Sequence, residues 1–219
     1  MDISQINNKW PIAKPGFPFI LISLAFTILF CLIGLKFVAV LTGIITLFII
    51  FFFRDPERTN SNEPKAVVTP ADGRILEIIH LNDSNNPLGE TAVKISIFMS
   101  IFNVHVNRIP VGGVIRKIVY NPGKFFSANL DKASEYNENN RVFLQTPDKH
   151  KVACIQIAGL IARRIVCWIK AGDQMETGQR FGLIRFGSRL EVFLPAASKI
   201  IAVPHQKVKA GKTIIGYLP

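Results

Sequence analysis

The sequence has little cysteine and lacks the usual signatures of nucleic-acid binding. Only three of its 219 residues are cysteines (Cys31, Cys154 and Cys167), and all three lie in apolar surroundings. An odd number in such a setting indicates reduced packing residues in a protein that faces the cytosol. No recognition helix, zinc motif or aromatic RNA-binding pattern accompanies the net charge of +11. We therefore expect the basic charge to meet anionic lipid headgroups and no nucleic acid.

Charge is absent from two long apolar runs near the N-terminus. Residues 17–35 and 37–53 contain no charged side chain, and Lys36 stands alone between them. Each run is close to the roughly 20 residues that cross a bilayer as a helix. A cleavable signal peptide fits poorly, because the apolar region is too long and no small-residue cleavage site follows it. The pattern predicts a transmembrane helical hairpin; a buried helical pair and a re-entrant hairpin are the alternatives.

Basic residues flank both ends of the predicted hairpin, and the two ends of a hairpin lie on the same side of a membrane. Lys9 and Lys14 precede it, and Arg54 and Arg58 follow it. Because positive residues tend to stay in the cytoplasm, both ends of the hairpin are expected there. The prediction is a protein of the cell (inner) membrane whose catalytic domain lies on the cytoplasmic side.

The rest of the chain is mainly β. We expect an N-terminal segment (1–16), the membrane hairpin (17–53), a polar linker (54–64) and a β-rich domain (65–219). Runs rich in β-branched residues, separated by Gly, Pro or Asn, predict strands at 67–68, 73–79, 92–98, 113–120, 141–144 and 152–157.

Two glycine-spaced segments, 170–179 and 208–216, resemble the hairpins of biotinyl/lipoyl-type β-sandwiches. Their glycines suit turn positions with positive φ. Neither segment places a lysine in the turn that carries lipoate or biotin, so these are expected to be framework hairpins.

Three motifs could carry chemistry, although each has an ordinary local explanation. Asp72 lies between Pro70-Ala71 and Gly73, where an aspartate most often forms a turn. His105 lies in an apolar strand-like stretch, where a histidine is most often a packing residue. Gly187-Ser188 joins two strand-like runs and could be a simple turn.

The Gly187-Ser188 bond nevertheless suits a self-processing protein. Glycine lets the backbone bend and exposes its carbonyl carbon, which the serine hydroxyl can attack from the C-terminal side. The resulting ester can undergo β-elimination and hydrolysis, which leaves a pyruvoyl group on the new N-terminus.

Taken together and in this order, the motifs resemble those of the phosphatidylserine decarboxylase proenzymes, particularly the short bacterial and archaeal form. The resemblance covers most of the chain, from the hairpin to the end. It is carried by Phe53-Arg54-Asp55-Pro56, Pro70-Ala71-Asp72-Gly73, Phe102-Asn103-Val104-His105-Val106-Asn107-Arg108, Pro122-Gly123-Lys124-Phe125 and Arg185-Phe186-Gly187-Ser188-Arg189.

This resemblance implies a zymogen that cleaves itself between Gly187 and Ser188. The products would be a membrane-bound β chain, 1–187, and an α chain, 188–219, whose Ser188 becomes a covalent pyruvoyl group. That group would form a Schiff base with phosphatidylserine in the bilayer, and decarboxylation would yield phosphatidylethanolamine. No metal or diffusible cofactor is implied, and a homo-oligomer is left open.

The residue that activates Ser188 is less well defined by the family pattern. In this family, longer relatives show His-x-x-His and use an Asp-His-Ser arrangement; here His105 matches the first histidine, and Arg108 occupies the second position. His105 and Asp72 are our candidates.

Two rival functions remain. A membrane-anchored, non-enzymatic adaptor with a lipoyl-like domain would explain the hairpin and the glycines, but not the set of Asp72, His105 and Gly187-Ser188. A conventional serine hydrolase is weaker, because the Gly-x-Ser-x-Gly elbow is missing around Ser188.

Overall fold

A computed structural model describes residues 6–59, 63–123, 137–159, 164–185 and 188–219. The chain divides into two compact units. One is Asn8–Glu57, which is helical, and the other is β-rich and contains Arg58–Pro219 together with the start of the chain. Each unit is described by itself.

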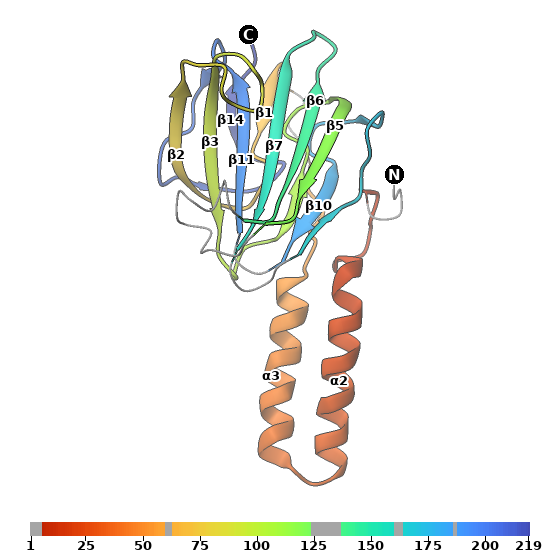
Figure 1. The fold of residues 1–219 in the computed structure, drawn as a ribbon. Helices are drawn as coiled ribbons and strands as arrows, with labels where there is room; N and C mark the ends of the chain where they lie inside the picture. The colour runs from red at the N-terminus through yellow and green to blue at the C-terminus, as the bar shows by residue number, and fades with distance from the viewer. Residues whose placement is uncertain (1–5, 60–62, 124–136, 160–163, 186–187) are drawn as a thin grey trace. The chain divides into compact units, whose positions relative to one another are not determined.

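The helical unit is an antiparallel pair (Figure 1). A short 3-10 helix, η1 (Lys14–Gly16), leads into α2 (Phe17–Leu32), and α3 (Lys36–Phe52) returns alongside it. Gly34 makes the connection with a φ of +81°, a value that glycine adopts without strain. The Ser23 and Thr46 hydroxyls are 2.7 Å apart and join the two helices within an otherwise apolar contact.

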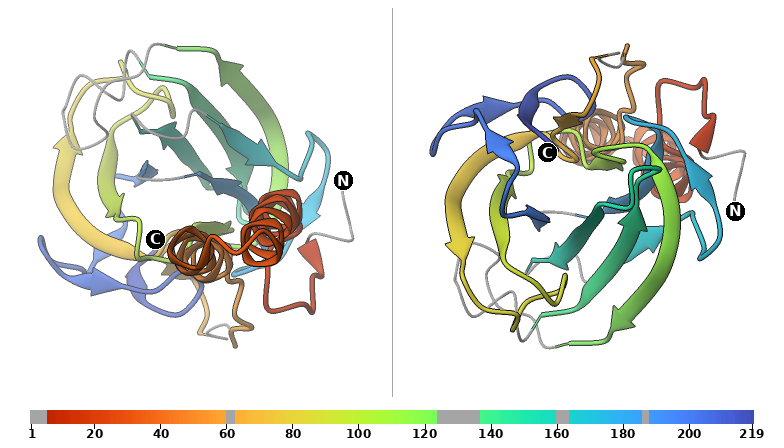
Figure 2. Two further views of the ribbon diagram at one scale, coloured as in Figure 1. Left: turned by 90° about the horizontal axis from the view of Figure 1, so that it is seen from below. Right: turned by 90° about the horizontal axis from the view of Figure 1, so that it is seen from above.

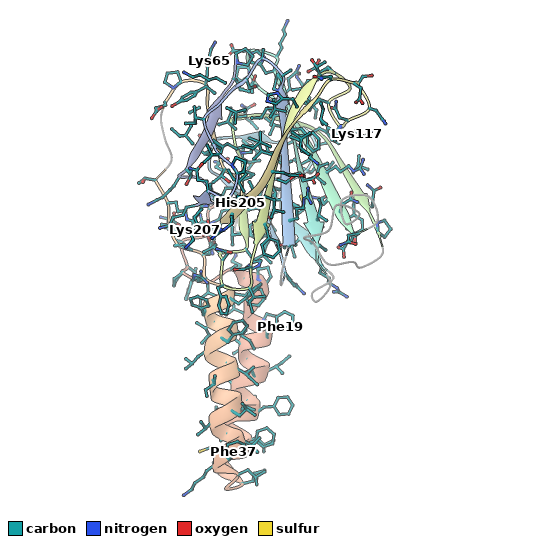
Figure 3. The ribbon with its side chains drawn as sticks, turned by 90° about the vertical axis from the view of Figure 1, so that its left-hand side faces the viewer. Phe19, Phe37, Lys65, Lys117, His205 and Lys207 are labelled. Atoms are coloured by element: carbon teal, nitrogen blue, oxygen red, sulfur yellow. The ribbon has the colours of Figure 1, made fainter. Side chains whose placement is uncertain are left out.

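The surface of this pair is apolar. Phe37 is 83% exposed and, with Phe19, projects from the helices (Figure 3). Among the described residues one helix, Lys14–Leu32, is long and apolar enough to cross a membrane, whereas Lys36–Phe52 is shorter. The two predicted helices are thus present, and a membrane crossing by both of them stays a prediction.

The ends of the pair are tied together by hydrogen bonds. The Ala13 N–H donates to the Phe53 carbonyl at 2.8 Å, and the Asn8 side-chain amide donates to the buried Asp55 carboxylate at 3.1 Å. Asp55 belongs to the segment that follows the second apolar run, so its carboxylate closes the base of the helical unit.

The β-rich unit is built on an eight-stranded antiparallel sheet that curls on itself (Figures 1 and 2). In spatial order its strands are β13 (Lys207–Val208), β2 (Gly73–Leu81), β3 (Ala92–Met99), β11 (Ser188–Pro195), β7 (Lys151–Ala158), β6 (Asn139–Gln145), β5 (Gly113–Asn121) and β9 (Gln174–Met175).

Two three-stranded sheets complete the unit. Their strands, in spatial order, are β1 (Ala66–Val68), β14 (Ile214–Tyr217) and β12 (Lys199–Ile200) in one, and β4 (Val106–Arg108), β10 (Arg180–Ile184) and β8 (Ile165–Cys167) in the other. All six strand runs predicted from the sequence are confirmed, and the strands of two to four residues are mostly those that the pattern missed.

The likeness of the two glycine-spaced segments to biotinyl/lipoyl-type hairpins stays a prediction. Gly172, Gly178 and Gly211 do have positive φ values, of 91°, 76° and 71°. Across the segment 170–179, β8 and β10 pair with each other, whereas the short strand β9 between them pairs with β5. The strands on either side of Gly211 do not pair with each other: β13 pairs with β2, and β14 with β1 and β12. The glycine pattern located the turns, but the strands next to the turns are too short to specify their own partners.

Close packing places the sheet of β10 against β7. A Cβ added at Gly182 on β10 would lie 2.4 Å from the Val166 carbonyl oxygen and 2.9 Å from the Gln156 side-chain nitrogen. Only glycine therefore allows β10 to pair with β8 and at the same time contact the Gln156 side chain of β7. This contact brings the β4–β10–β8 sheet to the start of β11.

Candidate active site

Ser188 is the first residue of β11, which runs between β3 and β7. Its Cα pairs with Met99 on one side and Ala158 on the other. The residue is fully buried, and its hydroxyl has no hydrogen-bond partner within the described part of the chain. A buried hydroxyl without a partner costs about 1–3 kcal/mol and calls for a functional explanation. Its neighbour Gly187 lies outside the described residues, as does Phe186.

His105 is held in one orientation and one tautomer. The ring is completely buried, and its Nδ1 lies 2.9 Å from the Asn103 carbonyl oxygen. Because a carbonyl only accepts, Nδ1 carries the hydrogen in the neutral ring. Nε2 then bears the lone pair, which is the form that a general base requires.

A tight turn after β3 fixes Asn103 itself. The Asn103 side-chain oxygen accepts from the Ser100 N–H at 2.9 Å and from the Ser100 hydroxyl at 2.8 Å. The backbone of His105 is fixed as well, since its carbonyl accepts from the Ile184 N–H at 3.3 Å. Ile184 ends the strand just before Ser188, and Met99 opposite Ser188 begins the turn. The topology therefore brings His105 and Ser188 to the same end of the sheet.

A row of buried amides crosses the face of the sheet on which Ser188 lies. Asn140 donates to the Gln156 side-chain oxygen at 2.8 Å, and Gln156 donates to the Asn107 side-chain oxygen at 2.8 Å. The Asn107 amide nitrogen faces the Met99 sulfur at 3.7 Å, which is a weak acceptor. Since Met99 and Ser188 are opposite each other, their side chains share a face. The row thus presents an N–H donor beside Ser188.

The next residue, Arg189, belongs to a buried ion network. Its guanidinium contacts the Glu77 carboxylate at 2.5 Å, the Ser96 hydroxyl at 2.8 Å and the Glu191 carboxylate at 3.0 Å. Burial alone would raise the pKa of Glu77. The hydrogen bond and the positive charge of Lys94, the hydrogen bond of Ser96 and the positive charge of Arg189 outweigh it, so the Glu77 pKa lies below its ordinary value. The charge of Arg189 is therefore neutralised within the fold.

Asp72 lies in the turn between β1 and β2, and the structure pairs it with Arg58. Both carboxylate oxygens accept from the Arg58 guanidinium, one of them at 2.8 Å, and the Ala210 N–H donates to the carboxylate at 2.8 Å. Within the described residues the Asp72 carboxylate makes no hydrogen bond to His105. The turn does touch the His105 segment through the backbone, because the Arg108 N–H donates to the Pro70 carbonyl at 2.9 Å.

The other described residues that were singled out from the sequence make contacts that stabilise the fold. The Arg108 guanidinium donates to the Gly178 carbonyl at 2.9 Å. Cys154 is buried, which raises the pKa of its thiol, and all three cysteines are free thiols. Lys124 and Phe125 lie outside the described residues.

Sequence reasoning did not find the amide row or the ion network. Asn107 and Arg189 lay inside quoted motifs without an assigned role, and Gln156 and Glu77 looked like ordinary strand residues. One signal in the sequence could have found these residues: a polar side chain at an inward position of an otherwise apolar strand needs a buried hydrogen-bond partner.

Comparison with known proteins identifies the family of the chain. A family model described as phosphatidylserine decarboxylase matches residues 45–216. The phosphatidylserine decarboxylase proenzyme of Syntrophus aciditrophicus is 49% identical over 207 residues, which cover 94% of this chain and 96% of that protein. The proenzyme of Desulfotalea psychrophila is 44% identical and covers 98% of this chain and 100% of its own length. That of Geotalea uraniireducens is 45% identical, with 97% and 99% covered. The chain belongs to the phosphatidylserine decarboxylase family.

Proposed function

We propose that the chain cleaves itself between Gly187 and Ser188 and then decarboxylates phosphatidylserine to phosphatidylethanolamine. The observation that carries this proposal is the Ser188 hydroxyl, which is buried at the start of β11 without a partner among the described residues. A hydroxyl held in this way is available as a nucleophile toward the peptide carbonyl that precedes it.

The cleavage balances without an external reagent other than water. The Ser188 oxygen bonds to the Gly187 carbonyl carbon and the peptide C–N bond breaks, which leaves an ester and a free amine. Loss of the Cα proton then expels the Gly187 carboxylate, which becomes the new C-terminus of the β chain. Water replaces the nitrogen of the resulting dehydroalanine, and ammonia and a pyruvoyl group result.

His105 is proposed as the group that moves the protons. Its Nε2 lone pair suits removal of the Ser188 proton, because Nδ1–H is engaged by the Asn103 carbonyl. The Asn107 amide is suited to bonding an oxygen that gains negative charge, since its facing neighbour is only a sulfur. The row behind it, through Gln156 and Asn140, keeps this donor oriented.

The surroundings of residue 188 fit a pyruvoyl group. The position is buried between two strands, and the Asn107 N–H donor lies on the same face, where a carbonyl oxygen would accept. When present, the group supplies a carbonyl that condenses with the substrate amine and accepts the electrons released with carbon dioxide. The buried residues around it exclude water and hold that amine near His105.

The helical unit and the basic charge are proposed to hold the enzyme at the cytoplasmic face of the cell membrane. The exposed apolar surface of α2 and α3 suits lipid, and the substrate is itself a bilayer lipid. The excess of basic residues would add attraction to anionic headgroups.

Replacing Ser188 tests the self-cleavage. We expect wild-type protein purified in detergent to contain two chains, the smaller with a blocked N-terminus, and Ser188→Ala to remain one inactive chain of 24.4 kDa. Intact-mass spectrometry measures both. An active wild-type protein that stays at one mass would rule out a pyruvoyl mechanism, and an uncleaved, inactive wild type would favour the adaptor.

Replacing His105 separates catalysis from packing. We expect His105→Ala to insert into membranes but to slow self-cleavage, decarboxylation or both by about 100- to 10,000-fold, the usual loss for a general acid or base. His80→Ala, on the exposed part of β2, is the matched control. Normal cleavage and near wild-type turnover in His105→Ala would reduce His105 to a core residue.

Asp72 and Arg58 should be compared as a pair. Breaking a buried ion pair costs about 3–5 kcal/mol, so Asp72→Asn and Arg58→Gln should lower the melting temperature by similar amounts. If Asp72 also assists His105, Asp72→Asn alone slows self-cleavage further, and this is the expected result. Equal cleavage rates in the two variants would make Asp72 solely a partner of Arg58.

Cysteine labelling tests the orientation. Thr59 is exposed just after the helical unit, and Cys31 is an exposed thiol at the end of α2. A membrane-impermeant maleimide should reach Thr59→Cys in inverted vesicles only. Labelling of Thr59→Cys from outside intact cells would contradict the cytoplasmic orientation.

A further inference from the structure

The last part of the chain is basic and contains no acidic residue. Residues 192–219 include four lysines and neither aspartate nor glutamate. All four lysines are exposed, and none of them makes an ion pair within the described residues: Lys199, Lys207, Lys209 and Lys212. Uncompensated charge of one sign on a short segment suits a partner of the opposite sign.

Two aliphatic side chains lie exposed beside these lysines. Ile201 is 47% exposed and Val203 is 58% exposed, whereas Ala202 between them is buried. A hydrogen-bonded turn follows, in which the Gln206 N–H donates to the Val203 carbonyl at 3.2 Å and the Val203 N–H donates to the Gln206 side-chain oxygen at 3.1 Å. This turn leads directly into β13, so the exposed aliphatic residues and the lysines of β13 are held close together.

The outward positions of β13 are basic. Lys207 and Lys209 are exposed, and Val208 between them is buried. Lys207 pairs with Arg74 of β2, which is exposed as well. Like charges directly opposite each other on neighbouring strands destabilise a sheet.

The carboxylates on the neighbouring elements do not compensate this basic pair. Asp72 is engaged by the Arg58 guanidinium, and Glu77 contacts Lys94 at 3.0 Å and Arg189 at 2.5 Å. The outer face of β13 and the start of β2 are therefore suited to anions that come from outside the chain.

Lysine on an edge strand also has an ordinary role, which is to prevent pairing with another chain. That role accounts for the lysines of β13, because β13 is an edge of the eight-stranded sheet. It does not account for Ile201 and Val203, since exposed aliphatic side chains beside an edge favour association. Aliphatic side chains flanked by lysines are instead typical of surfaces that enter the headgroup region of an anionic bilayer.

The register places this surface at the end of the sheet where Ser188 lies. Lys207 pairs with Arg74, and Arg74 pairs with Phe98. Phe98 in turn pairs with Arg189, the residue next to Ser188. Three strand spacings of about 4.8 Å separate β13 from β11, so the surface lies about 15 Å from the candidate site along the sheet. Both belong to the same compact unit.

We infer that a docking strip, formed by Arg74, Ile201, Val203, Lys207 and Lys209, binds the β-rich unit to an anionic lipid surface. The two aliphatic side chains enter the headgroup region, and the basic groups meet lipid phosphates while their methylene stems lie along the apolar boundary. The inference deepens the proposed function and rests on it, because docking serves to bring a bilayer lipid to the Ser188 end of the sheet.

Most of the docking strip belongs to the α chain that the proposed cleavage would create. Ile201, Val203, Lys207 and Lys209 all follow Ser188 in the sequence. The residue that would carry the pyruvoyl group and the lipid contact are therefore joined covalently in one short chain, and cleavage does not separate them.

An environment-sensitive fluorophore on Val203→Cys tests the docking in the full-length protein. The label is a nitrobenzoxadiazole maleimide in a Cys31→Ser background; Cys154 is buried, and burial raises the pKa of the Cys167 thiol, which slows its reaction. In vesicles that mix phosphatidylglycerol with phosphatidylcholine, we expect the emission to shift to the blue and doxyl-labelled lipid to quench it. The shift should disappear in pure phosphatidylcholine and at high salt, which screens the charges.

Asp148→Cys is the matched control for the label. Asp148 is exposed and lies on the connection between β6 and β7, at the end of these strands away from Ser188. A fluorophore there should stay in water in both kinds of vesicle.

Two pairs of lysine substitutions test the charge. Lys207→Gln with Lys209→Gln removes two charges from the docking strip, and Lys117→Gln with Lys149→Gln removes two exposed charges from the side of β5, which lies opposite β2 (Figures 2 and 3). A lysine near an anionic surface contributes about fivefold in affinity, so the first pair should lower the ratio of docked to undocked label by about 25-fold. The second pair should leave this ratio unchanged.

The same variants link docking to turnover. In the mixed vesicles, the variant of Lys207 and Lys209 should show a higher KM for phosphatidylserine, with kcat within about threefold of wild type, because the strip makes no contact with the reacting atoms. Intact mass confirms that each variant has cleaved itself.

The outcomes separate the inference from its foundation. A Val203→Cys label that stays in water in phosphatidylglycerol vesicles overturns the docking, and so does equal docking by the two lysine variants. A shift that appears equally in neutral vesicles and grows with the protein-to-lipid ratio assigns the strip to a second copy of the chain and overturns the inference as well. Because the fluorescence does not depend on turnover, a wild type that docks but releases no carbon dioxide from phosphatidylserine refutes the proposed function and leaves the docking in place.

Discussion

The pairing of β11 between β3 and β7 is the constraint on which the site depends. Residues alternate between the two faces of a strand, so a slip of one residue would turn every side chain of β11 over. In the observed register Ser188 and Leu190 share one face of the sheet, and Arg189 and Glu191 share the other. Arg189 secures this choice, because its guanidinium can meet Glu77, Ser96 and Glu191 only from that face. The ion network beside Ser188 therefore acts on the position of Ser188, the proposed nucleophile.

The face of the sheet that carries Ser188, with the segments packed on it, combines features that a stable core would avoid. It contains a hydroxyl without a partner in the described structure, a fully buried imidazole and a row of three amides. Each of these costs desolvation energy, and the row ends on a sulfur in place of an oxygen acceptor. A fold departs from the usual rules of core packing in this way mainly at functional sites. The close approach at Gly182 brings β10 against the Gln156 side chain of β7. Because the Ile184 N–H of β10 donates to the His105 carbonyl, the backbone of His105 is held near β7 as well.

The sequence predicted the long strands and the apolar helices because their signals are local. A run such as Ala92–Met99 carries its own alternation, and α2 its own length and apolarity. The two-residue strands β9, β12 and β13 carry no such signal, and their pairing depends on tertiary contacts. The same holds for the candidate site. Motifs singled out Ser188, His105 and Asp72 as candidates, but the Arg58 partner of Asp72 and the amide row arise from residues far apart in the chain, whose proximity only the fold creates.

The topology also explains how a cleaved protein would stay assembled. Cleavage before Ser188 would leave an α chain that contains β11, β12, β13 and β14. Of these, β11 pairs with β3 and β7, β13 with β2, and β14 with β1, all of which belong to the β chain. The core residues of β11 are buried on both faces, so separation of the two chains would expose the centre of the sheet. All of the pairings named here are made by residues from Ser188 onward, so breaking the bond that precedes Ser188 would remove none of them. The fold can therefore give up this bond for chemistry while the strands on either side keep the new chain end in place.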